Sequence, residues 1–137
     1  ALEVDHEALD SVAVVCGRAY PVGEIKKMIV SALQDVGMPP QLLGYEYLQC
    51  AIFQAAQKTS LLHNITTCLY PIVAQEYDST PQKIERSIRH AIESTWNRSS
   101  VDATHKLFGY SVSRETGRPT NSEFIARMTD YIQLKCT

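Results

Sequence analysis

The residues with the most evident chemistry lie in one stretch, TPQKIERSIRHAIESTW, which spans residues 80–96. It combines cations with planar side chains that donate or accept hydrogen bonds, and such groups contact the phosphates and base edges of DNA. On a helix, at about 100° per residue, these groups fall on one face, opposite a narrow apolar stripe. The polar face carries Gln82, Lys83, Glu85, Arg86, Arg89, His90 and Glu93. The stripe carries Ile84, Ile88, Ala91, Ile92 and Thr95.

Three of the polar residues have the hydrogen-bonding groups that distinguish base pairs in the major groove. The first turns of a recognition helix face the base edges. There Arg86 can donate two parallel hydrogen bonds to guanine, Gln82 can pair with adenine, and Glu85 can accept from cytosine. The pattern therefore indicates a candidate base-reading set of Gln82, Glu85 and Arg86.

Other residues are suited to holding the DNA backbone. Lys83, Arg89 and His90 flank the base-reading positions and would lie along phosphates, which fix register without reading sequence. Asn64 or Thr66, at the start of the preceding helix, can present backbone N–H groups to a phosphate. These five residues are the candidate phosphate contacts.

The same face has a plainer interpretation as an ordinary solvated helix surface. Glu85 and Arg89 are four residues apart and can simply pair with each other. His90 is equally consistent with a surface or capping histidine. Tyr70 and Trp96 are interpreted as core residues rather than as stacking platforms for bases. The charged face alone therefore does not separate DNA binding from a solvent-exposed helix.

Periodic apolar residues predict the helices that must position this face. Thr80 suits the N-cap and Pro81 the first position of the helix. Pro71 is expected to kink or split the segment that contains it. A capping box of Thr120 and Glu123 begins the last helix. Helices are predicted over about 24–36, 42–58, 62–77, 80–96 and 101–107, with a loop over 108–121 before the last one.

The predicted fold class is all-α, a compact bundle of about six helices. The sequence contains no convincing strand pair, although residues 12–20 could form a short strand. A length of 137 residues suits a single domain. Residues 1–23 are interpreted as an N-terminal arm or linker, and residues 24–137 as the helical domain.

Residues 62–96 also have the order of a helix-turn-helix. Ala74 would be the small residue where the two helices cross, and Ile84 and Ile88 would pack back on the first helix. The glycine common in such a turn is replaced by a residue near Asp78. The predicted recognition helix covers about 81–97, with its first turns in the major groove.

Composition and charge weigh against several other classes of protein. The net charge is −2, but residues 83–118 carry seven basic and four acidic residues, a modest excess that suits DNA. No apolar run approaches a membrane span, and no basic region of a signal peptide is present. The four cysteines lack metal-ligand spacing, so we expect reduced thiols in the cytoplasm and neither metal nor other cofactor. No carboxylate pair, Cys–His pair or phosphate loop indicates an enzyme.

Five separate motifs occur in one order along the chain. They are GYxYL (44–48), LYP (69–71), IERSIRHAIE (84–93), LFGYSVS (107–113) and PTNSEFIA (119–126). Together they resemble the C-terminal effector domain of the sporulation response regulator, the stage zero sporulation protein A family. The resemblance runs from about Ile25 to Leu134. It implies an all-helical domain of a two-component transcription regulator, which binds a box with the core TGTCGAA upstream of early sporulation genes.

The resemblance also implies roles for individual residues and for partners. Glu85 and Arg86 match the family's base-reading pair, and Arg89 with His90 matches the adjoining DNA contacts. Two copies are expected to lie head-to-tail on tandem boxes. The final helix or the loop at 108–121 is expected to contact the sigma subunit of RNA polymerase or the neighbouring copy.

The chain departs from the family pattern at positions that affect charge. Lys83 stands where the family usually has Arg, and Gln82 where it often has Ser. Gln75 and Glu76 replace a usually basic pair, and Thr67 replaces a Lys. The lost positive charge predicts weaker or more selective DNA binding. It also motivates an alternative, a helical protein-interaction module that keeps the fold but has lost or weakened DNA binding.

Residues 1–23 do not resemble the phosphoacceptor module that precedes the effector domain in this family. In the family, that module controls dimerisation. The chain is therefore expected to be either an excised effector fragment or a variant that is regulated in another way.

Overall fold

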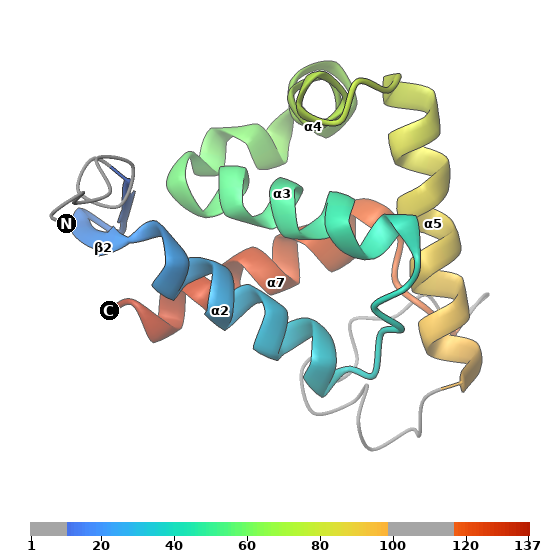
Figure 1. The fold of residues 1–137 in the computed structure, drawn as a ribbon, viewed down its shortest axis with the longest axis horizontal. Coiled ribbons are helices and arrows are strands. Elements are labelled where there is room, and N and C mark those ends of the chain that lie inside the picture. Colours follow the sequence, from blue (N-terminus) through green and yellow to red (C-terminus); the bar gives the residue numbers. More distant parts are fainter. Residues whose placement is uncertain (1–10, 99–116) are drawn as a thin grey trace, which may run out of the picture.

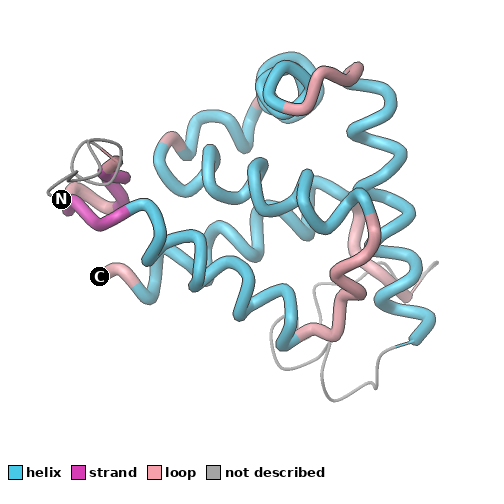
Figure 2. Tube along the Cα trace, viewed as in Figure 1, coloured by secondary structure: helices cyan, strands magenta, loops and turns pink. Residues whose placement is uncertain are grey.

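The computed structural model describes residues 11–98 and 117–137. Helices dominate this part of the chain, and a small antiparallel sheet of two strands precedes them (Figures 1 and 2). The α-helices are α2 (Val22–Asp35), α3 (Leu43–Gln57), α4 (Tyr70–Glu76), α5 (Pro81–Arg98) and α7 (Asn121–Lys135). A 3₁₀-helix, η1 (Thr59–His63), and a π-helix, η2 (Ile65–Leu69), connect α3 to α4.

The helices predicted over 24–36, 42–58 and 80–96 are confirmed with small shifts of their ends. The helix predicted over 80–96 spans Pro81–Arg98, and those predicted over 24–36 and 42–58 are α2 and α3. The capping box of α7 is present, because Thr120 Oγ1 accepts from the Glu123 N–H at 3.1 Å and Glu123 Oε1 accepts from the Thr120 N–H at 2.9 Å. The predicted helix at 101–107 and most of the predicted loop at 108–121 lie outside the described residues.

Pro71 divides the helical segment that contains it, as predicted. Proline has no N–H to donate, and its ring clashes with the carbonyl four residues earlier. The chain before Pro71 is widened into the π-helix η2, where the Leu69 N–H donates to Asn64 O at 3.2 Å. The narrower α4 begins at Tyr70, one residue before the proline.

The expectation that the sequence holds no strand pair is wrong. Strand β1 (Val12–Val15) pairs antiparallel with β2 (Arg18–Pro21), and Val15 lies opposite Arg18. The two-residue loop consists of Cys16 and Gly17, with φ of 54° and 78°. A two-residue turn with positive φ at both central residues has a backbone twist that matches the right-handed twist of the flanking strands. A single glycine beside a cysteine is a weak turn signal, so the sequence alone does not predict the hairpin.

The hairpin packs on the helices. Ala13 and Val15 are fully buried and belong to the same hydrophobic core as the helices. The Tyr20 hydroxyl donates to the carbonyl oxygen of Cys136 at 2.6 Å, which fastens the hairpin to the end of α7. Figure 1 shows β2 and the C-terminal end together, at the side of the molecule away from α5. A boundary between arm and domain near residue 23 stays a prediction.

The core confirms the apolar stripe of α5. All five stripe residues are buried, and the Thr95 hydroxyl donates to the Ala91 carbonyl at 2.7 Å, which satisfies its one polar group. From α7, Phe124 packs edge-on against Trp96, with ring centroids 5.9 Å apart. Burial of the stripe leaves the polar face of α5 as the side that can meet a partner.

α3 and α5 approach each other closely at Gly44, near the start of α3. A β-carbon at this position would lie 2.6 Å from the β-carbon of Ala91 and still closer to the Ser87 carbonyl oxygen. Both of these residues belong to α5. Figure 1 shows α5 running across one end of α3. Only a residue without a side chain permits the two backbones to approach this closely.

We expect Gly44→Ala to destabilise the protein because the new methyl group would push α3 away from α5. Overpacking of this kind costs about 1–3 kcal/mol, which thermal and urea denaturation would measure. Gly23→Ala is the matched control, since a β-carbon at Gly23 in α2 has nothing within 4 Å. Equal stability of the two variants would contradict the close approach.

Candidate nucleic-acid interface

A tight turn between α4 and α5 sets the direction of α5. Asp78 in this turn has φ of 51°, in the left-handed region that Asp tolerates better than most residues. The Ser79 N–H donates to the Ala74 carbonyl at 2.8 Å and closes the end of α4. Thr80 Oγ1 accepts from the Lys83 N–H at 3.3 Å, as predicted for an N-cap. Asp78 thus occupies the position where a turn glycine was expected.

The polar face of α5 lies at the surface. Gln82, Lys83, Arg86, Arg89 and His90 are exposed, and Glu85 is half-buried. These six side chains come from the first three turns of the helix, so they form one continuous polar surface. Asn64 and Thr66, at the start of η2, are also exposed.

A hollow flanks this surface on each side. One brings Thr66 of η2 together with Gln82, Glu85, Arg86 and Arg89 of α5. The other lies on the α3 side of the helix and is lined by Leu43, Gly44, Arg86, Ser87 and His90. Arg86 borders both hollows and is therefore central to the surface. Lys83 and Asn64 line neither of them.

Ion pairs run along one side of the polar face. Arg89 Nη1 lies 2.8 Å from Glu85 Oε1, the pairing that the plainer interpretation anticipated. Arg89 Nε also lies 3.9 Å from Glu93 Oε1, and Arg118 Nη2 lies 3.4 Å from that same oxygen. Exposed pairs four residues apart stabilise a helix by only about 0.3–0.5 kcal/mol. The pairing therefore balances charge in the unbound protein more than it stabilises the fold.

Asn121 connects the three helices around this surface, and sequence reasoning gave it no role. Its side-chain amide donates to the Tyr70 hydroxyl at 3.1 Å and to the Glu85 carbonyl at 3.0 Å. Tyr70 is buried, as predicted, and this burial raises the pKa of its hydroxyl, although the bond from Asn121 lowers it. The one sequence signal for Asn121 is its position as the first residue of a helix that begins with a capping box.

The three positions at which the resemblance implies positive charge are at the surface as well. Gln75 and Glu76, at the end of α4, and Thr67 in η2 are exposed. Their side chains therefore add no cation beside α5, and Glu76 adds an anion. Within the first three turns of α5, the exposed cations are Lys83, Arg86 and Arg89.

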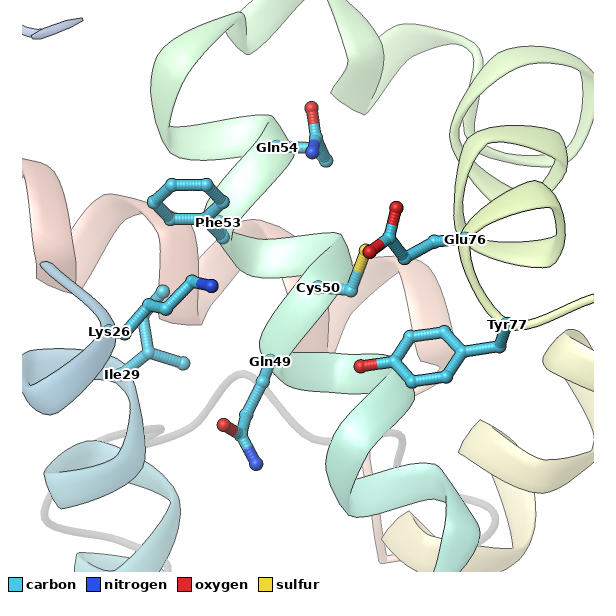
Figure 3. A pocket seen from close by; sticks show the side chains of 8 residues that line it. All are labelled: Lys26, Ile29, Gln49, Cys50, Phe53, Gln54, Glu76 and Tyr77. Atoms are coloured by element: carbon cyan, nitrogen blue, oxygen red, sulfur yellow. The ribbon is translucent and has the colours of Figure 1, made fainter. Parts of the chain in front are cut away.

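A separate pocket lies between α2, α3 and the end of α4 (Figure 3). Lys26 lies over the Phe53 ring, 5.4 Å from its centroid, and Glu76 and Tyr77 line the opposite wall. The Cys50 thiol sits between the two walls. Burial, and secondarily the negative charge of Glu76, raise the pKa of Cys50 to about 11. This thiol is a poor nucleophile near neutral pH because the thiolate is the reactive form.

We expect Cys50 to be alkylated slowly in the folded protein. A pKa raised from 9.0 to about 11 lowers the thiolate fraction roughly a hundredfold near pH 8. Iodoacetamide labelling followed by peptide mass spectrometry should show at least about tenfold faster reaction in urea. Cys68 is exposed and serves as the internal control. Equal labelling of Cys50 before and after unfolding would contradict this protected environment.

Two other features are absent from residues 11–98 and 117–137. No group of three or more His, Cys, Asp or Glu residues there could hold a metal ion. Among the helices of the same ranges, none combines the length and apolar character needed to cross a bilayer. The candidate site is therefore the polar face of α5, which carries Gln82, Lys83, Glu85, Arg86, Arg89 and His90.

Comparison with protein families shows which family the chain is similar to. A family model described as Sporulation initiation factor Spo0A C terminal matches residues 29–132. The match begins inside α2 and ends inside α7, so it includes all of α5 and leaves out the hairpin. This family is the DNA-binding domain of a sporulation regulator. The chain therefore belongs to the sporulation initiation factor Spo0A C-terminal family.

Proposed function

We propose that the chain binds double-stranded DNA sequence-specifically as a transcriptional regulator, with α5 in the major groove of a TGTCGAA-like box. The observation that carries this proposal is the division of α5 into a buried stripe and an exposed polar face. The polar face carries charged and amide side chains. Figure 1 shows that α5 lies at one end of the molecule. A helix of this kind fits the width of the major groove.

In this proposal, α4 and α5 form a helix-turn-helix. Ala74 is buried on α4, and α4 contacts α5, which is consistent with a small residue at the crossing. Ile84 and Ile88 are fully buried on the inner side of α5. In this motif the first helix crosses the DNA backbone while the second enters the groove.

Gln82, Glu85 and Arg86 read the bases. Among the described residues, no ion pair or side-chain hydrogen bond engages the Arg86 guanidinium. Its planar fork is therefore available for two parallel bonds to guanine. Glu85 Oε1 is engaged by Arg89, and the pair can hold the carboxylate in place to accept from a cytosine amino group. Gln82 is exposed in the first turn, where base edges are closest.

Lys83, Arg89 and His90 hold phosphates on the two sides of the groove, and Asn64 and Thr66 add contacts at the start of η2. On one side of the groove, the proposed phosphate contact is supported by the hollow that Thr66 and Arg89 both line. On the other side, the proposed phosphate contact is supported by the hollow that His90 and Arg86 line. Phosphate contacts of this kind fix the register of the helix on the duplex.

Family resemblance extends the proposal to partners. Two copies lie head-to-tail on tandem boxes, and α7 or residues 108–121 contact the sigma subunit of RNA polymerase. Leu134 near the end of α7 is 66% exposed, so its side chain is accessible to a partner. Cooperative footprints on tandem boxes would support the arrangement of two copies.

We expect the protein to retard a duplex that contains TGTCGAA, with affinity that falls steeply as salt rises. Arg86→Ala should remove the preference for the box over a scrambled duplex, a loss of about 1–3 kcal/mol of discrimination. Band-shift titrations over a salt series would measure both effects. Arg18→Ala is the matched control because Arg18 is exposed on β2, away from α5.

Two outcomes would count against DNA reading by α5. Undetectable or salt-insensitive binding would favour the alternative of a protein-interaction module with the same fold. An unchanged preference for the box in the Arg86→Ala variant would show that Arg86 does not read a base.

A further inference from the structure

Arg118 brings a cation from outside α5 to the edge of its polar face. It lies two residues before the N-cap of α7, and its side chain is partly exposed. Its guanidinium contacts Glu93 Oε1 at 3.4 Å, and the Arg89 Nε lies 3.9 Å from the same oxygen. Because both groups contact one carboxylate oxygen, Arg89 and Arg118 are immediate neighbours, although they are far apart in sequence.

One hollow joins Arg118 to the proposed phosphate contacts. Thr66, Arg89, Arg118 and Ser122 all line it, so it runs from η2 across α5 to the start of α7. Thr66 and Arg89 already have phosphate-binding roles in the proposed function. A duplex strand that passes these two residues would next meet Arg118, since phosphates repeat along the strand at short, regular intervals.

The chemistry of Arg118 suits such a contact. Arginine has five N–H donors in a planar fork that matches phosphate geometry. A bond from Nη2 to Glu93 is therefore compatible with a second acceptor on the same guanidinium. Glu93 holds the two cations side by side in the unbound protein, and this fixes the spacing at which they would meet a strand.

We propose that Arg118 is a further DNA-backbone contact, which extends the phosphate-binding side of α5 to the start of α7, with Glu93 as its positioning residue. This inference rests on the proposed function, since it requires α5 in the groove. It assigns Arg118 a sequence-independent role. Loss of Arg118 should therefore weaken binding to every duplex alike.

The test is the salt dependence of binding for Arg118→Gln, measured on a TGTCGAA duplex and on a scrambled duplex of equal length. At low salt we expect affinity to fall about tenfold on both. The slope of log K against log salt should become shallower by about 0.9, the value for one phosphate contact. Arg18→Gln on β2 makes the same chemical change far from α5 and should leave the slope unchanged.

Arg118→Lys separates a charge contact from a structural role. Lysine keeps the charge but not the fork, so the slope should return to that of the unchanged protein while thermal denaturation confirms folding. An unchanged slope in Arg118→Gln would overturn the proposal, as would a loss confined to the TGTCGAA duplex. Absence of salt-dependent binding by the unchanged protein would instead overturn the proposed function, and this inference with it.

Discussion

At Gly44 the start of α3 approaches α5 so closely that a side chain there would overlap the Ser87 carbonyl. This approach lets the stripe from Ile84 to Thr95 enter a core shared with α3 and α7. The stripe and the polar face are opposite sides of one helix, so burial of one side points the other toward solvent. The position of the candidate interface therefore depends on packing at a residue that carries no charge.

Two further sets of contacts fix the orientation of α5 relative to α4 and α7. At its start, the left-handed Asp78 and the Ser79–Ala74 hydrogen bond set the angle at which the chain leaves α4. Asn121, the first residue of α7, holds the Tyr70 hydroxyl and the Glu85 carbonyl, and so ties α4 to α5. A helix fixed in this way can present side chains without large rearrangement, and this preorganisation lowers the cost of binding.

Electrostatics explains how a chain of net charge −2 can belong to a DNA-binding family. Along one side of α5, Glu85 and Glu93 balance Arg89 and Arg118 in the unbound protein. Such pairs contribute little stability at the surface, but they keep the guanidinium groups ordered. Gln75 and Glu76 add no positive charge at the end of α4, so long-range attraction of an anion is modest. In the proposed function, recognition then relies on contacts at close range, above all from Arg86.

Much of α5 could be predicted from the sequence, because its caps and its period of 3.6 residues are local properties. The stripe, the N-cap at Thr80 and the capping box at Thr120 were all confirmed. Motif resemblance indicated the family, which the match over residues 29–132 then showed. The hairpin was missed because its Cys–Gly turn gives a weak local signal.

Only the tertiary structure brought Asn121 to Glu85, Arg118 to Glu93, and Gly44 to Ser87. These contacts join residues far apart in sequence, and no local periodicity encodes which distant residues will meet. The sequence by itself determined which side chains α5 exposes, since helical geometry follows from neighbouring residues. The fold decided which other helices stand beside that face, because packing selects among many arrangements of the same helices.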